Sequence, residues 1–249
     1  MSTPWRSFIE RSARVLRDNS ASVISMSGAF RSGEPKLLFR YRSPQEIGQH
    51  VTGCDSDLGG SSTAMLDISP EDGRGRFSGV VSTNVPRLKD GSVVGGYAGF
   101  RNRARTSLFG AITDDLELHN YLALRVRAAG DPRTRTAYFV NVQTEGPDPP
   151  DLWQHRLYLN KEDQSPNGVW ETVLIPFNSF ELASVDDAPS GQNMSRHRIR
   201  SIGISVLGGR AKISGTYELG IDYIAAINEP EDASRLDALA DGGEPSGAS

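Results

Sequence analysis

The spacing of hydrophobic residues changes along the chain. Between Pro4 and Asn19 apolar residues recur at three- to four-residue intervals, which predicts one amphipathic helix. A second, short helix is predicted after Ser43, because Pro44 and Glu46 follow this cap residue in the order of a capping box. Beyond residue 60 the period becomes two, as in half-buried strands.

Alternating segments of this kind make up most of the remaining chain. The clearest are residues 122–127, 138–143, 202–206 and 217–223. Shorter candidates are residues 63–68, 75–82, 95–101, 153–159 and 171–176. Strands separated by Gly, Pro and Asp, with no helical pattern between them, favour packed antiparallel sheets over a parallel sheet. We therefore expect an all-β fold, an antiparallel β-sandwich of the jelly-roll type.

Charge and composition divide the chain into three expected parts. Residues 1–38 form a basic helical segment, residues 39–228 the β domain, and residues 229–249 an acidic, flexible tail in which Ala233–Leu239 could form a brief helix. The Arg- and Ser-rich start is typical of a mitochondrial transit peptide, although its two acidic residues are not. A helix that simply packs on the fold is the alternative interpretation of this segment.

The overall composition excludes several classes of protein. With 249 residues, 37% of them hydrophobic, the chain can bury a core of its own. It has no apolar stretch near the roughly 20 residues of a membrane-spanning helix, and a single cysteine is typical of a reducing compartment. Because no cluster of Lys and Arg with interleaved aromatics is present and the pI is near 5.6, we expect no nucleic-acid partner.

The sequence also lacks the common motifs of catalysis and cofactor binding. Its four histidines are far apart, so no local zinc ligand pair exists, and no phosphate loop, dinucleotide fingerprint or nucleophile elbow occurs. We expect no catalytic residue, cofactor or metal. Cys54 is a poor candidate nucleophile, because the neighbouring carboxylates of Asp55 and Asp57 disfavour a thiolate. Asp55 and Asp57 fit a turn that bonds local amides, with a structural calcium site as the alternative.

Tryptophans provide the one signal for carbohydrate binding. Trp5, Trp153 and Trp170 could form a platform for sugar rings, but Trp153 and Trp170 follow the parity of apolar strand positions. We therefore expect both of these side chains in the core and no sugar binding.

A series of short motifs, in a fixed order over residues 39–227, resembles one known family. The motifs are Asp55 with Leu58-Gly59-Gly60-x-Ser62, Gly96–Arg101, Tyr121–Arg127, Val140–Val142, Trp170–Phe180, Ile199–Ser205 and Leu219–Ile224. In this order they resemble the complex I intermediate-associated protein 30 family, whose members have a galactose-binding-like jelly roll.

The resemblance implies a non-catalytic assembly factor, or chaperone. It implies partners that are an intermediate of mitochondrial complex I (NADH:ubiquinone oxidoreductase) and other assembly factors. The implied location is the mitochondrial matrix, peripheral to the inner membrane through the client. Three alternatives stay open: a carbohydrate-binding module, a cytosolic interaction module on the same fold, and an enzyme that uses Asp114 and Asp115.

Strand parity predicts the surface that binds a partner. The buried side of the strand at 122–127 is expected to carry Leu122, Leu124 and Val126, so Arg125 and Arg127 point outward. By the same rule Arg156 points outward from its own strand. Arginine is enriched at interfaces because its planar fork binds carboxylates. We expect Arg125, Arg127 and Arg156 to form one partner-binding face, with the loops at 143–152 and 184–197 as alternatives.

Overall fold

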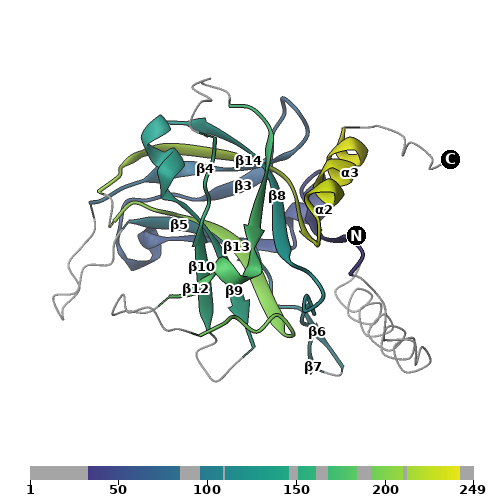
Figure 1. The fold of residues 1–249 in the computed structure, drawn as a ribbon. Helices are drawn as coiled ribbons and strands as arrows, with labels where there is room; N and C mark the ends of the chain where they lie inside the picture. The colour runs from purple at the N-terminus through teal and green to yellow at the C-terminus, as the bar shows by residue number, and fades with distance from the viewer. Residues whose placement is uncertain are drawn as a thin grey trace, which may run out of the picture.

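The protein is a sandwich of two six-stranded antiparallel sheets (Figure 1). The computed structural model describes residues 33–84, 96–108, 110–145, 151–160, 168–183, 192–209 and 212–241. The predicted all-β sandwich is confirmed. The predicted helix at 4–19 and Trp5 lie outside the described residues.

The first sheet has the strand order β11-β8-β14-β4-β3, and β1 also pairs with β14. Its strands are β1 (Lys36–Arg40), β3 (Met65–Ile68), β4 (Gly75–Val81), β8 (Tyr121–Gly130), β11 (Glu171–Pro176) and β14 (Gly215–Ile227). The second sheet has the order β12-β10-β9-β13-β5-β2. Its strands are β2 (His50–Cys54), β5 (Tyr97–Asn102), β9 (Tyr138–Thr144), β10 (Leu152–Arg156), β12 (Glu181–Leu182) and β13 (Ile199–Leu207). The predicted strands all fall on these elements, whereas β1, β2 and β12 were missed.

Smaller elements connect the strands. They are the hairpin β6 (Thr106–Ser107) with β7 (Gly110–Ala111), the helices α2 (Pro44–Ile47) and α3 (Pro230–Ala240), and the 3-10 turns η1 (Asp55–Leu58), η2 (Pro132–Ala137) and η3 (Phe177–Ser179). The predicted cap of α2 is confirmed, since the Ser43 hydroxyl accepts a hydrogen bond from the Glu46 amide. The Glu46 carboxylate accepts one in return from the Arg42 amide.

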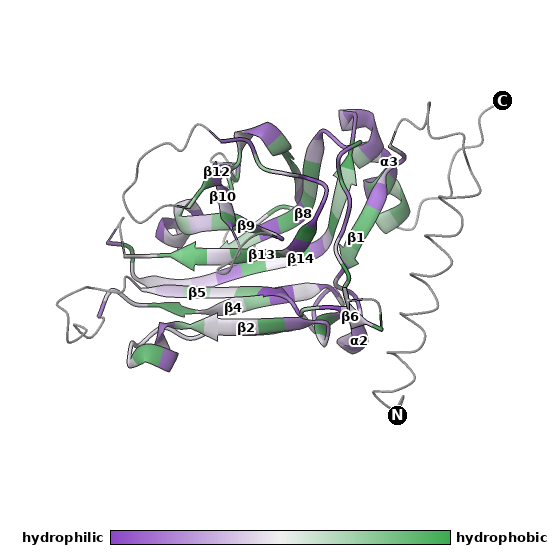
Figure 2. Cartoon of the chain, turned by 90° about the horizontal axis from the view of Figure 1, so that it is seen from below, coloured by the Kyte–Doolittle hydropathy of each residue, from purple (hydrophilic) through white to green (hydrophobic). Residues whose placement is uncertain are grey.

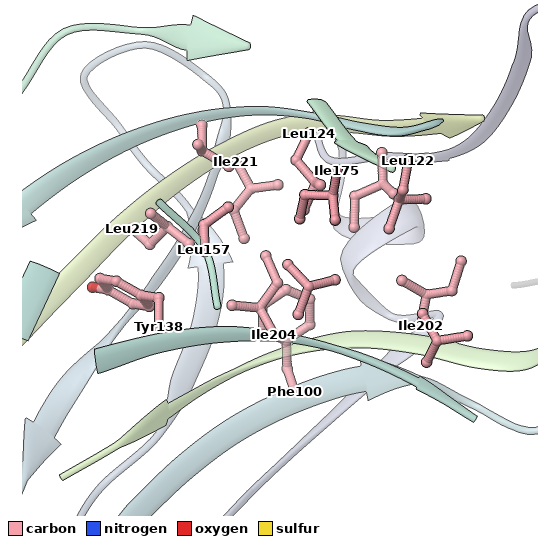
Figure 3. Packing of buried hydrophobic residues seen from close by; sticks show 14 of the residues in the cluster. Phe100, Leu122, Leu124, Tyr138, Leu157, Ile175, Ile202, Ile204, Leu219 and Ile221 are labelled. Atoms are coloured by element: carbon pink, nitrogen blue, oxygen red, sulfur yellow. The ribbon is translucent and has the colours of Figure 1, made fainter. Parts of the chain in front are cut away.

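The core lies between the two sheets, where inward-facing side chains of both meet (Figure 3). Leu122, Leu124 and Val126 of β8 are fully buried, as their parity predicts. Leu122 and Leu124 face the second sheet, where Ile202 and Ile204 of β13 are buried as well (Figure 3). Truncating a core Leu or Ile to Ala typically costs about 2–5 kcal/mol. The core therefore fixes which side chains of each strand point outward.

The motif around Asp55 proves to be structural. Asp55 is 1% exposed, and its two carboxylate oxygens accept hydrogen bonds from the amide and the hydroxyl of Ser62, at 2.8 and 3.0 Å. Gly60 packs so closely that a Cβ there would lie 2.4 Å from the Asp55 carboxyl carbon. The turn interpretation is confirmed, and both Asp55 oxygens proposed for calcium already have a partner. Cys54, next to this turn, lies 3.0 Å from the Ser56 hydroxyl.

The expected acidic tail is wrong for residues 230–241. Here the chain forms α3, which packs on the outer face of the first sheet (Figures 1 and 2). Ala233 of the helix is buried in a second apolar cluster with Ala123, Tyr223 and Ala225. The folded domain therefore runs at least from Lys36 to Asp241, beyond the predicted limits of 39 and 228. Composition indicated a flexible tail because it does not show that Asp237 and Asp241 pair with arginines distant in the sequence.

Candidate functional site

The three arginines that we expected on one face lie on two. Arg125 and Arg127 belong to β8 of the first sheet, and Arg156 belongs to β10 of the second. Because each points outward from its own sheet, Arg156 lies on the opposite side of the sandwich. The single arginine face of the sequence prediction is therefore wrong, and the error is one of topology: parity gives the side of a strand but not which sheet contains it.

Arg125 is also far less accessible than predicted, because α3 covers it. It points outward, yet it is 8% exposed. Its guanidinium lies 2.9 Å from the Asp237 carboxylate and 2.6 Å from that of Asp241. A third carboxylate, Asp222, lies 3.8 Å from its Nε. Burial opposes the charge of Arg125, but the contacts with Asp241 and Asp237 raise its pKa overall, so the guanidinium stays charged.

Asp222 is the centre of the charged group. It is 1% exposed, and Arg42 donates to its two oxygens in a bidentate contact at 2.6 and 2.8 Å. Arg74 lies 3.2 Å from it. Asp222 is the extra residue of a β-bulge, where the register between β14 and β8 shifts between Ile221 and Tyr223. We call Arg42, Arg74 and Arg125, around Asp222, the arginine cluster.

Two acidic residues, Asp237 of α3 and its C-cap residue Asp241, complete the arginine cluster. Asp241 contacts Arg74 and Arg125, at 2.8 and 2.6 Å, and hydrogen bonding to Arg125 lowers the pKa of its carboxyl group. Asp237 accepts hydrogen bonds from Thr172 and from the Tyr223 hydroxyl, the latter at 2.6 Å. Burial, followed by the contact with Asp237, raises the pKa of Tyr223. The cluster thus binds carboxylates, and its arginines are too basic to transfer protons.

Trp170 extends this surface toward Arg127. The Arg74 and Arg127 guanidinium groups lie over the Trp170 ring, at 4.8 and 5.3 Å from its centroid. The ring covers Gly220, where a Cβ would lie 3.1 Å from it. Trp170 therefore packs outside the sandwich, and the prediction that it belongs to the core is wrong. Arg127 in turn pairs with Asp72 at 3.4 Å.

Trp153, by contrast, is a core residue as predicted. It is 3% exposed and belongs to the main hydrophobic cluster. Its ring therefore has no free face for a sugar, and the faces of Trp170 lie against guanidinium groups. The aromatic platform considered from the sequence is not formed by these two residues.

The outer face of the second sheet is polar but carries few charges. Gln154 donates to Asn141 at 2.7 Å, and Asn141 donates to Ser205 at 2.9 Å, so neutral side chains bridge three strands. Arg156 is exposed and lies over the Phe139 ring, 5.3 Å from its centroid. This face places Arg156 in solvent, as predicted, with an aromatic contact that parity alone does not reveal.

The fold also joins residues that sequence spacing kept apart. Asp115, Glu117 and His197 are exposed and bring one potential metal-ligand atom each within 4.8 Å of the others. His197 lies 2.9 Å from Asp115, while Asp114 pairs with Lys36 and Arg105. Asp114 and Asp115 thus have different partners, and their arrangement is not that of an acid–base pair acting on one substrate. Spacing between histidines could not reveal a cluster that combines His197 with carboxylates.

Sequence reasoning missed Arg42, Arg74 and Asp222 as parts of a site. The available signal was Asp222 itself, a charged residue within a run of otherwise apolar, alternating strand positions. A buried carboxylate requires a cationic partner, and the partners were distant in sequence. Three of the motifs quoted above supply Arg125, Trp170 and Asp222, so separate parts of the pattern meet on this face.

Comparisons with known proteins place the chain in a family. The family model described as Complex I intermediate-associated protein 30 (CIA30) matches residues 39–221. A Neurospora crassa protein named "Complex I intermediate-associated protein 30, mitochondrial" is 33% identical over 93% of this chain and 87% of its own length. Drosophila melanogaster and mouse proteins of the same name are 32% and 23% identical, and the matches cover 81% and 79% of this chain. They cover 66% and 57% of those two relatives.

Solved structures with a similar chain course include carbohydrate-binding modules. A family 11 module from Clostridium thermocellum, crystallised with a mixed-linked tetrasaccharide, is 17% identical with a TM-score of 0.49, over 78% of this chain and 95% of that one. A solution structure named CtCBM11 is 16% identical with a TM-score of 0.48, over 82% of this chain and 99% of that one. The sequence matches, which span most of the chain, decide the assignment: the chain belongs to the Complex I intermediate-associated protein 30 family.

Proposed function

We propose that this chain is a non-catalytic assembly factor that binds an intermediate of respiratory complex I in the mitochondrial matrix. The observation that carries the proposal is the family match over residues 39–221, together with relatives whose names give both the complex I intermediate and the mitochondrion. The arrangement of the first sheet supports it, because the arginine cluster is suited to binding carboxylates rather than to chemistry.

The outer face of the first sheet is the proposed working surface. Arginine forks bind carboxylates with two hydrogen bonds, and the Arg42 contact with Asp222 has this form. The same face offers Trp170, an aromatic residue of the kind enriched at protein interfaces. The described residues contain no helix that is both long and apolar enough to cross a membrane. The proposed attachment to the inner membrane is through the client.

The test is affinity purification of the tagged chain from intact mitochondria and from cytosol, in cells that lack their own copy. We expect matrix localisation, co-purification of complex I subunits without the full enzyme, and restored complex I activity. A protein that stays in the cytosol, or cells that assemble normal complex I without it, would contradict the proposal. The readout of this experiment is the composition of the captured complex.

A further inference from the structure

The residues at the C-terminal end of α3 do not by themselves favour a helix. Asp237 and Asp241 lie at its C-terminal end, and its last turn contains no basic residue. Carboxylates at this position oppose the helix dipole, and an isolated helix of 11 residues is marginal in water. The Arg42 guanidinium donates to the Ala240 carbonyl at 2.6 Å, which satisfies one of the free groups of the last turn. The helix therefore depends on the arginine cluster.

The arginine cluster, in turn, depends on α3 for charge balance. Among the sheet and loop residues, Asp222 is the carboxylate that Arg42, Arg74 and Arg125 share. Without α3 three cations would surround one buried anion. Asp237 and Asp241 supply the two missing charges from positions one helical turn apart, at i and i+4.

The fit of α3 to the cluster is incomplete. Arg125 is nine-tenths buried, yet its Nε has no hydrogen-bond partner among the described residues. The apolar contact of α3 is also small, since Ala233 is its buried apolar residue and Leu236 and Ala240 are partly buried. A helix whose carboxylates also reach the Nε of Arg125, or whose apolar contact is larger, would bind more tightly.

We propose that α3 is the exchangeable occupant of a docking face, and that this face takes an acidic amphipathic helix of a partner protein. The partner helix carries carboxylates four residues apart for Arg74 and Arg125, and apolar residues for the patch formed by Ala123, Tyr223 and Ala225. The inference rests on the proposed function for the identity of the partner, a protein of the assembly pathway. Charge complementarity and the bound α3 define the chemistry of the helix.

The internal position of α3 makes it a strong competitor. It follows β14 after only Asn228 and Glu229, so its effective concentration at the cluster is in the millimolar range or above. A partner helix gains access when α3 opens. Acidic helices that bind the face with low affinity therefore do not displace α3.

The first experiment is hydrogen exchange on the full wild-type chain under native conditions. We expect the amides of α3 to exchange at least about tenfold faster than those of β14, because α3 opens while the sandwich stays folded. Equal exchange rates would mean that α3 leaves only when the whole domain unfolds, and would overturn the proposal. This measurement needs no variant and is independent of whether any substitution impairs folding.

The second experiment measures binding of a labelled peptide with the sequence of residues 229–241. The full chain with Asp237→Asn and Asp241→Asn, in which α3 loses its ion pairs with Arg74 and Arg125, should bind the peptide at least about tenfold more tightly than the wild-type chain does. The matched control peptide carries the same two Asp→Asn changes and should not bind. Equal binding to both chains, or equal binding of both peptides, would overturn the proposal.

The occupant is tested by sedimentation of the wild-type chain over a range of concentrations. A monomer at all concentrations agrees with a heterologous helix, whereas dimers formed by mutual exchange of α3 would assign the face to a second copy and overturn the proposal. These assays use no mitochondria. If the peptide binds but no complex I subunit co-purifies from cells, the proposed function alone is refuted. If complex I subunits co-purify but the peptide does not bind, the exchange of α3 alone is refuted.

Discussion

The two outer faces of the sandwich are built from similar strands but are stabilised in different ways. On the first sheet, buried charges form a network that joins β8, β14 and α3 around Asp222. On the second sheet, half-buried neutral side chains such as Asn141 and Gln154 bridge strands. Buried charges are costly to leave unpaired, whereas half-buried amides can still bond to water instead. The first face should therefore be sensitive to substitution and the second tolerant.

The largest expected effect is that of Asp222→Ala. Removing the shared carboxylate leaves Arg42 without an acidic partner among the described residues and Arg74 with Asp241 alone, which should cost about 3–5 kcal/mol in the free energy of unfolding. Asn141→Ala is the matched change on the second face and should cost at most about 1 kcal/mol. Urea unfolding of both variants checks the comparison. Similar losses for the two would show that the faces do not differ.

Ending the chain after Asn228 should have the next largest effect. Without α3 the apolar cluster around Tyr223 and Ala225 is exposed and the arginine cluster loses two carboxylates. We expect a loss of about 2–3 kcal/mol, with the sandwich still folded. Thermal unfolding followed by circular dichroism measures it. An unchanged unfolding midpoint would instead support the flexible tail that the composition predicted.

Lowering the pH should reduce the stability that Asp241 contributes on the outer face of the first sheet. Because Arg125 lowers the pKa of Asp241 in the folded chain, the unfolded chain binds this proton more readily. The stabilisation is complete above the unfolded pKa, near 4, and is lost as the pH falls through the lower folded pKa. Asp241→Asn should therefore flatten the decline of stability below pH 4. Unfolding curves from pH 2 to 6 test this, and parallel declines for the two chains would exclude the contribution.

The smallest effect is expected for Arg156→Ala on the second face. Its contact with Phe139 is solvent-exposed, and such cation–π contacts contribute about 0.5–1 kcal/mol. Denaturant unfolding should detect a change no larger than this. A loss above about 2 kcal/mol would mean that Arg156 has a structural role comparable to that of Arg125.

The parts of the fold that depend on neighbouring residues could be predicted from the sequence. Alternation in 122–127 gave β8 and its inward side, and Ser43 with Glu46 gave α2, because each signal lies within a few residues. The accessibility of Arg125 could not be predicted, since a helix about a hundred residues later covers it. For the same reason α3 was expected to be disordered: its acids are stabilised by arginines that pattern analysis cannot pair.

Partial success at single residues has a related cause. Trp170 directly precedes β11, which suggested a core position, but the ring covers Gly220 on the outside. Arg156 was correctly predicted to be exposed, yet its sheet was not predicted, because strand order is a property of the complete fold. Local pattern thus gives the direction of a side chain, while its neighbours depend on topology.

The most direct test of the proposed working surface compares Arg125→Gln with Arg156→Gln, the same change on opposite faces. Each variant is expressed in cells that lack the endogenous protein, at matched steady-state levels, and assembled complex I is measured on native gels. If the first face binds the client, Arg125→Gln should reduce assembled complex I several-fold while Arg156→Gln restores it fully. Full restoration by Arg125→Gln together with a loss for Arg156→Gln would contradict the account and transfer the working surface to the second sheet.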